Sequence, residues 1–218
     1  MALYLDSASV DDARRSATLG YVAGITTNPT LIARTGRAGD EVVAELCDVH
    51  PGPVFYQPVA DRVLEREAEV RRVAALRRGR VVLKLPSTPD NFALAARLAR
   101  EGYVVAMTAI FGPAQAYLAG QAGARFVLPY VNRSTRLLGD GPGLVRTMRA
   151  VIDSAGAPVE IVAASIKSTS EAVETILAGA HSLTLPLALL DRLGWHELSD
   201  RAIAEFAEAV TGAAANPG

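Results

Sequence analysis

The chain has 218 residues, a length that suits one sizeable hydrophobic core and is short for two independent domains. Apolar residues make up 50% of it and charged residues 21%, with a formal net charge of −1 and no basic stripe of the kind that binds nucleic acid. The N-terminus does not resemble a signal peptide, no apolar run approaches the roughly 18 residues that span a bilayer, and the single Cys47 cannot form an intramolecular disulfide. We therefore expect a cytoplasmic protein with no nucleic-acid or membrane partner.

Short apolar runs rich in valine and isoleucine recur along the chain, and each is followed by a segment with helical spacing of its apolar residues. The expected strands, in chain order, are 2–6, 22–27, 54–59, 81–85, 104–110, 126–131, 160–164 and 181–187. Helical patterns begin at Val10, fill two stretches between Asn28 and His50, and recur at 61–78, 87–100, 113–121, a stretch ending at Ser154, 169–178 and 196–210. We interpret 134–143, with its three glycines, as a loop.

Eight strand–helix units in sequence predict an α/β fold with a parallel sheet, because most of the strands are apolar throughout, as strands buried on both faces are. The count of eight favours a single (β/α)8 TIM barrel with an additional C-terminal helix. A doubly wound open sheet is the alternative, but such a sheet usually carries a glycine-rich phosphate loop after its first strand, where this chain has Asp6-Ser7-Ala8. We place the barrel domain with its C-terminal helix at 1–212 and expect a disordered tail at 213–218.

Polar residues close nearly every expected strand, and in a barrel these strand ends meet on the face where active sites are built. They are Asp6, Thr26, Thr27, Asn28, Gln57, Lys84, Thr108, Tyr130 and Ser165. Strand ends are often polar simply because they meet solvent. That explanation accounts poorly for a lysine and an aspartate within apolar runs.

Lys84 is the sharpest case, because Val81-Val82-Leu83 and Leu85-Pro86 flank it. Burial of its stem would lower the pKa of the amine and produce a neutral nucleophile able to attack a carbonyl. The alternative is a structural lysine paired with a carboxylate such as Asp6.

Arg133, Ser165 and Lys167 follow the sixth and seventh strands, where barrels often bind phosphate close to a helix N-terminus. The alternative is that they are surface residues of loops. The three histidines form no spaced cluster with carboxylates, so we expect no metal ion, and the chain gives no sign of a cofactor site.

The chain resembles the transaldolase family, and most closely its small subgroup that includes fructose-6-phosphate aldolase. The similarity covers essentially the whole chain in the same order. The segments that carry it are Leu3-Tyr4-Leu5-Asp6, Gly24-Ile25-Thr26-Thr27-Asn28-Pro29, Val82-Leu83-Lys84-Leu85-Pro86, Pro129-Tyr130-Val131-Asn132-Arg133, Ala163-Ala164-Ser165 and Thr184-Leu185-Pro186.

The resemblance implies a role for each matching position. Lys84 corresponds to the Schiff-base lysine, Asp6 to the carboxylate that takes and returns the substrate hydroxyl proton, and Thr108 to a threonine that holds the catalytic water. The substrate-binding set that it implies is Asn28 for the donor hydroxyls, Arg133, Ser165 and Lys167 for the phosphate, and the motif residues Thr26, Thr27 and Asn132.

Two positions are similar to the aldolase pattern, namely Gln57, where transaldolases place a glutamate, and Tyr130, where they place a phenylalanine. A tyrosine hydroxyl can serve the proton transfers that a glutamate–water pair otherwise handles, which adds Gln57 and Tyr130 to the expected catalytic residues. Leu128 departs from the family, which has a small residue or a serine there, near the donor's terminal hydroxyl. A leucine would crowd that hydroxyl or leave it unpaired.

The resemblance thus implies a class I aldolase that reversibly cleaves a ketose phosphate, such as fructose 6-phosphate, into dihydroxyacetone and glyceraldehyde 3-phosphate. One alternative is a transaldolase that passes the dihydroxyacetone unit to another sugar phosphate or to an unusual acceptor. Others are a barrel lyase without a Schiff base and a non-catalytic phosphosugar-binding barrel. The expected partners are small-molecule sugar phosphates and further copies of the chain, in a homo-oligomer such as a pentameric or decameric ring.

Overall fold

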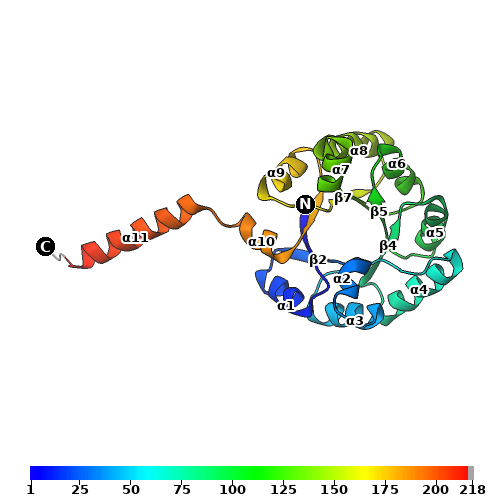
Figure 1. Cartoon of the computed structure of the whole chain (residues 1–218), viewed down its shortest axis with the longest axis horizontal. Coiled ribbons are helices and arrows are strands. Elements are labelled where there is room, and N and C mark those ends of the chain that lie inside the picture. Colours follow the sequence, from blue (N-terminus) through cyan, green and yellow to red (C-terminus); the bar gives the residue numbers. More distant parts are fainter. Residues whose placement is uncertain (216–218) are drawn as a thin grey trace.

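In the computed structural model, which describes residues 1–215, eight parallel strands close into a barrel in chain order, with β8 pairing back onto β1. The strands are β1 Ala2–Asp6, β2 Val22–Thr26, β3 Val54–Tyr56, β4 Val81–Pro86, β5 Val105–Ile110, β6 Phe126–Pro129, β7 Glu160–Ala163 and β8 Ser182–Leu185. Figure 1 shows the ring of helices around them. The predicted (β/α)8 barrel is confirmed, and the open sheet is excluded because a closed barrel has no edge strand.

The helices of the described residues alternate with these strands along the chain. They are α1 Val10–Leu19, α2 Pro29–Ala33, α3 Gly39–Val49, α4 Val63–Leu76, α5 Pro89–Arg100, α6 Pro113–Gln121, α7 Val131–Leu138, α8 Gly141–Ala155, α9 Thr169–Leu177, α10 Leu187–Leu193 and α11 Glu197–Ala215. Side-chain caps explain several starts: Asn28, Thr88 and Ser168 each accept a hydrogen bond from a backbone N–H three residues on.

The barrel has two apolar layers because side chains alternate along each strand. One face of every strand packs against the surrounding helices in the larger core. The other face fills the barrel interior with a compact cluster of Tyr4, Phe55, Val82, Ala106, Phe126, Leu128 and Val162. The ring of Phe55 lies 5.4 Å from that of Tyr4 and 5.2 Å from that of Phe126, so the interior below the site is filled by side chains.

The segment after β6 corrects the sequence interpretation. Residues 131–138 form helix α7, whereas we expected the strand to continue to 131 and a loop to follow over 134–143. Gly139, at φ 92°, ends α7 in a conformation that favours glycine, and Asp140 then caps α8. Gly141 has no room for a side chain, since a Cβ there would lie 2.3 Å from the carbonyl oxygen of Val131. These glycines join two closely packed helices and do not form a long loop.

Several element ends also differ from expectation. Strand β3 stops at Tyr56 and not at 59, and 187 begins helix α10 where we expected the last strand to end. In both places the apolar pattern continues past the point where the chain leaves the sheet. Short apolar runs do not distinguish a strand from the helix or loop that follows it.

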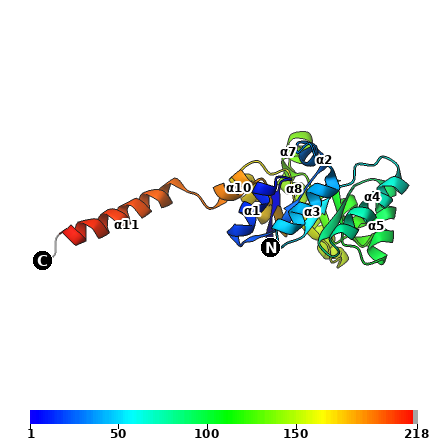
Figure 2. The same ribbon diagram turned by 90° about the horizontal axis from the view of Figure 1, so that it is seen from below.

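Helix α11 extends away from the barrel in both views (Figures 1 and 2). Its apolar side chains Ile203, Phe206 and Val210 are 63%, 70% and 71% exposed. The domain boundary that we expected at 212 falls inside this helix, which ends at Ala215, and residues 216–218 lie outside the described part. No helix among the described residues is long and apolar enough to cross a membrane.

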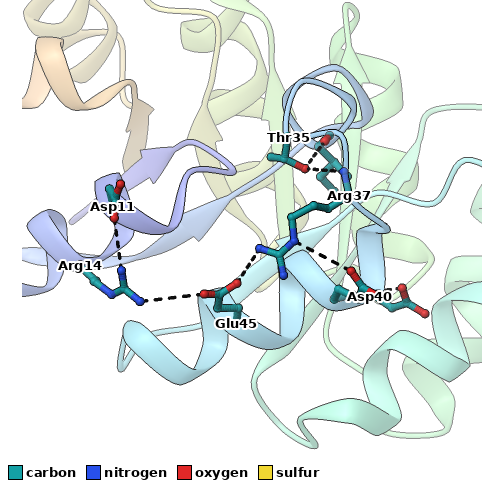
Figure 3. Close-up of polar contacts among 8 residues, drawn as sticks. Asp11, Arg14, Thr35, Arg37, Asp40 and Glu45 are labelled. Carbon is teal, nitrogen blue, oxygen red and sulfur yellow. Dashed lines mark hydrogen bonds and ion pairs between the residues drawn. The ribbon is translucent and has the colours of Figure 1, made fainter.

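Surface ion pairs link α1 to the turn between α2 and α3 (Figure 3). Arg37 donates to Glu45 at 2.7 Å, and Arg14 lies 4.0 Å from the same carboxylate and 3.3 Å from Asp11. All four side chains are well exposed, so solvent screens these pairs and each contributes little to stability. The charge of Arg37 is thus paired with a carboxylate, whereas Arg34, three residues earlier, makes no ion pair among the described residues.

Candidate active site

Lys84 lies at the carboxyl end of β4, inside the barrel. Because Val82 belongs to the interior cluster, the alternation of the strand directs Lys84 inward as well, while Leu83 and Leu85 pack against the helices. Its side chain is 3% exposed, and Nζ donates a 2.6 Å hydrogen bond to the carbonyl oxygen of Thr27. No carboxylate among the described residues lies within ion-pair distance of this nitrogen. Burial therefore lowers the pKa of Lys84 from 10.5 to about 8, against the opposing charge of Asp6.

Asp6 reaches the same space from β1, two residues after the interior residue Tyr4. Thr26 Oγ1 donates to its Oδ1 at 3.1 Å and lies 2.6 Å from the hydroxyl of Thr184, which fixes the threonine. Burial raises the pKa of Asp6, while Lys84, the Thr26 hydrogen bond and Lys167 act in the opposite direction. The pKa of the carboxyl is thus raised and that of the amine lowered, which suits groups that exchange protons near neutral pH.

Tyr130 and Gln57 bring further polar groups to the site. Thr108 Oγ1 donates to the Tyr130 hydroxyl at 3.3 Å, and the Tyr130 ring meets the Phe111 ring edge-on at 5.8 Å between centroids. Gln57 Oε1 is buried and has no hydrogen-bond partner within residues 1–215. An unpaired buried acceptor of this kind is costly, so it fits a site that a substrate hydroxyl or a water completes.

A cleft of about 480 Å³ opens above these groups. It is lined by Asp6, Thr26, Asn28, Pro29, Thr30, Leu31, Arg34, Gln57, Lys84, Leu128, Tyr130, Arg133, Ala164, Ser165 and Lys167. The charged side chains of this lining are four bases and one acid, and Figure 2 shows α2 and α7 standing above the barrel on the side away from the N-terminus. The cleft therefore suits an anionic ligand.

The expected phosphate residues are held by the β6–β7 side of the cleft. The Arg133 guanidinium carbon lies 4.8 Å from the centre of the Tyr130 ring. Ser165 has a left-handed backbone, with φ 61°, and its carbonyl oxygen accepts from the Asn132 N–H at 3.0 Å. Such a conformation costs a non-glycine residue about 1–3 kcal/mol, and residues of this kind cluster at functional sites.

Nine of the twelve predicted site residues line the cleft, and the other three do not. Thr27 contributes its carbonyl to Lys84, since its hydroxyl donates to the Phe55 carbonyl at 2.7 Å. Thr108 is fully buried and acts on Tyr130. Asn132 donates to Glu171 at 3.1 Å and lines a neighbouring depression. Successive residues of α7 are about 100° apart around the helix axis, so Asn132 and its neighbour Arg133 face different directions.

Arg34 is a charged cleft residue that sequence reasoning missed. It is exposed and makes no ion pair among the described residues, and it belongs to the end of α2 and not to a strand end. Asn28, by contrast, was found, and its Oδ1 caps α2 by accepting from the Leu31 N–H at 3.0 Å. That bond leaves the amide nitrogen of Asn28 available to a ligand. Arg34 can be recognised as a cleft residue only from the position of α2 above the barrel.

Leu128 lines the cleft from below and is fully buried among the interior residues. It pairs in register with Thr108 on β5. A ligand hydroxyl placed against this side chain would have no hydrogen-bond partner there. The leucine therefore disfavours ligands that carry a hydroxyl at this position.

Comparisons with known proteins identify related chains of the same length class. The family model described as transaldolase/fructose-6-phosphate aldolase matches residues 3–216. A probable transaldolase of Caulobacter sp. (strain K31) is 38% identical over 206 residues, which cover 94% of this chain and 94% of the relative. A probable transaldolase of Symbiobacterium thermophilum is 37% identical over 206 residues, covering 94% of this chain and 95% of the relative.

Solved structures with the same fold are more distant. A mandelate oxidase mutant superimposes with a TM-score of 0.62 at 15% identity, over 86% of this chain and 64% of that longer chain. At this identity the likeness concerns the barrel alone. The family model and the curated relatives, in contrast, cover nearly the full length, so the chain belongs to the transaldolase/fructose-6-phosphate aldolase family.

Proposed function

We propose that this enzyme forms a Schiff base between Lys84 and a ketose phosphate and then cleaves a carbon–carbon bond as an aldolase. The observation that carries the proposal is the environment of Lys84, a buried amine with one neutral hydrogen-bond acceptor and a pKa of about 8. Roughly a tenth of such amines are uncharged at pH 7, and only the uncharged amine attacks a carbonyl.

The first step is addition of the Lys84 amine to the ketone carbon. The resulting carbinolamine loses its hydroxyl as water, with a proton supplied by a neighbouring acid, and leaves an iminium ion. Arg133, Ser165 and Lys167 hold the phosphate at the other end of the substrate. Their arrangement on one side of the cleft orients the chain of carbons relative to Lys84.

In the second step the Asp6 carboxylate takes the proton of the hydroxyl that lies two carbons from the iminium carbon. The bond that breaks joins the carbon bearing this hydroxyl to the carbon next to the iminium. Its electron pair forms the carbon–carbon double bond of an enamine, while the π electrons of the iminium move to nitrogen. An aldehyde phosphate leaves, and the enamine remains on Lys84. The raised pKa of Asp6 strengthens it as a proton acceptor for this step.

In the third step the enamine takes up a proton at carbon, and water then hydrolyses the new iminium to release the ketone and the free amine. We assign the positioning of this water to Tyr130 and Gln57, with Thr108 holding Tyr130 through its 3.3 Å hydrogen bond. The unpaired Gln57 Oε1 supplies an acceptor for it. Thr26, at the end of β2, and Asn28, which caps α2, face the donor hydroxyls.

A transaldolase is the second candidate, because the curated relatives are named probable transaldolases. In that reaction the enamine attacks a new aldehyde and is not protonated. Gln57 and Tyr130 favour the aldolase, since they supply water-ordering groups at the place where the enamine is discharged.

One assay separates the two reactions. Purified protein receives fructose 6-phosphate without any acceptor aldehyde, and glyceraldehyde 3-phosphate release is followed against enzyme concentration. Continuing release supports the aldolase. Release that stops near one equivalent per chain supports the transaldolase, and borohydride that traps no adduct in either case would refute the Schiff base.

We also propose that the chain forms a homo-oligomer through α11. The exposed apolar stripe of Ile203, Phe206 and Val210 on a helix that stands away from its own barrel suits packing on a neighbouring copy. Phe206→Asp should lower the molecular mass in multi-angle light scattering to that of a smaller assembly. An unchanged mass would refute this role for α11.

A further inference from the structure

We infer that Arg66 is a positioning residue that joins the loop after Gln57 to the end of the strand that carries Lys84. Arg66 lies on helix α4, outside the barrel, and contacts no group that lines the cleft. Its side chain nevertheless donates three hydrogen bonds: two end at the loop after Gln57, and the third reaches Asn91, which in turn donates to the end of β4. The inference rests on the proposed function, because it concerns how Gln57 is aligned with the Lys84 adduct.

Side chains of helix α4 form hydrogen bonds with both the N–H groups and the carbonyl groups of the loop after Gln57. The Glu69 carboxylate accepts hydrogen bonds from the N–H groups of Val59 (3.1 Å) and Ala60 (2.9 Å) and from the Tyr56 hydroxyl. One turn earlier, Arg66 Nε donates to the carbonyl of Ala60 at 3.1 Å and Nη2 to that of Asp61 at 2.7 Å. Donors and acceptors of the loop are therefore both occupied by one rigid helix.

The third bond of Arg66 leads to the neighbouring strand. Its Nη1 donates to Asn91 Oδ1 at 2.7 Å, and Asn91 Nδ2 donates to the carbonyl of Pro86 at 2.8 Å. Asn91 is 1% exposed and Pro86 is two residues after Lys84. Because both polar atoms of the Asn91 amide are used, a movement of Arg66 passes directly to the end of β4.

The chain needs this connection because β3 is only three residues long and ends just before Gln57. The backbone ladder between β3 and β4 pairs Val54, Phe55 and Tyr56 with Val81, Val82 and Leu83, and it stops short of both Gln57 and Lys84. Beyond the end of this ladder, the hydrogen bonds of Arg66 on α4 and Asn91 on α5 connect the two segments. Gln57 Oε1 has no partner of its own, so its position depends on the backbone that carries it.

Arg71 provides a matched control on the same helix. It also bridges α4 to α5, through Glu101 at the end of α5 at 2.8 Å, and it pairs with Glu67 of its own helix at 2.7 Å, but among the described residues it contacts neither the loop backbone nor Asn91. Replacement of Arg66 and of Arg71 by alanine should therefore cost comparable stability, whereas only the first should affect the reaction.

The test is a double-mutant cycle between Arg66→Ala and Gln57→Ala, measured as turnover of fructose 6-phosphate and as borohydride-trapped adduct. Arg66→Ala should lower kcat by about tenfold with unchanged adduct formation, since the misplaced group acts after the Schiff base. In the Gln57→Ala background it should change kcat by less than about twofold. Arg71→Ala should leave kcat within about twofold of the wild type.

Independent, multiplicative effects of the two substitutions would overturn the inference, and so would an equal loss of kcat in Arg71→Ala. If Arg66→Ala does not fold, Asn91→Asp replaces it, because an aspartate keeps an acceptor for Arg66 and puts an oxygen that cannot donate in place of the donor to Pro86. Normal kcat in that variant would again contradict the inference. A wild type without adduct or turnover would refute the proposed function itself, and the inference with it.

Discussion

A basic residue lies near each end of strand β4, and the two differ in burial and in their hydrogen-bond partners. Arg80 precedes the strand, and its Nη2 donates to the carbonyls of Cys47, His50 and Gly52. Lys84 follows four residues later and donates to one carbonyl, that of Thr27. Arg80 is partly exposed, whereas Lys84 is almost completely buried.

The difference shows that one strand has a residue suited to a structural role at its amino end and the proposed nucleophile near its carboxyl end. At the amino end a permanently charged side chain is hydrogen-bonded to the loop after α3, and it holds that loop against the barrel. At the carboxyl end a buried amine lacks a carboxylate partner within ion-pair distance, so its charged form is disfavoured. We therefore expect Arg80 to contribute to stability, and we propose Lys84 as the residue that reacts with the substrate.

The largest expected effect is the loss of turnover in Lys84→Met. The substitution keeps the length of the side chain and removes the nucleophile, so we expect no turnover of fructose 6-phosphate and no adduct after borohydride reduction. The measurement is mass spectrometry of the reduced protein beside a steady-state assay. Residual turnover near the wild-type level would show that the reaction proceeds without this amine.

The same variant should be more stable than the wild type at neutral pH. The pKa of Lys84 is lowered in the folded state, to about 8 from 10.5, so below pH 8 the folded protein bears the full cost of this buried charge. That cost is about 3 kcal/mol, and it disappears as the pH rises through 10.5. Urea denaturation at pH 7 and at pH 10.5 should therefore show a gain for Lys84→Met at pH 7 alone.

Asp6→Asn should slow carbon–carbon cleavage by on the order of 10², as for loss of a general base, while the adduct on Lys84 still forms. Single-turnover release of glyceraldehyde 3-phosphate and borohydride trapping give the two quantities separately. Loss of the adduct in this variant would assign Asp6 to Schiff-base formation and not to cleavage.

Arg80→Ala tests the other end of the strand. It removes the donor shared by three carbonyls, and we expect the free energy of unfolding to fall by about 2–4 kcal/mol. Adduct formation and kcat of the folded protein should stay unchanged, because the residue lies at the opposite end of the barrel from the cleft. A fall in kcat without a fall in stability would contradict the contrast between the two ends.

Arg34→Ala should have the smallest effect, a rise of a few-fold in KM for phosphorylated substrates, about 1 kcal/mol, with kcat retained. The reason is that an exposed, unpaired cation at the cleft rim attracts the anionic substrate without contacting the reacting atoms. Arg37→Ala is the control, since Arg37 is paired with Glu45 outside the cleft. Equal KM changes in both variants would point to a general charge effect.

Much of the site was predictable because the alternation of a strand is a local property. Asp6, Lys84 and Gln57 stand at ends of apolar runs, and parallel strands bring their carboxyl ends together. The loop expected at 134–143 was wrong, and Asn132 lies outside the cleft, for a related reason. Once the chain leaves the strand, its direction depends on how α7 packs against α8, and a glycine-rich pattern does not specify this.

The sequence by itself determined the eight repeated units, the inward position of Lys84 and the family to which the chain is related, since each depends on the order and spacing of residues. Only the tertiary structure decided that Thr27 offers Lys84 a carbonyl, that Arg34 joins the cleft and that Arg66 and Asn91, 25 residues apart in the chain, meet. These contacts form between elements that are distant along the chain. Their geometry follows from how the helices pack around the closed barrel, which no local pattern of residues contains.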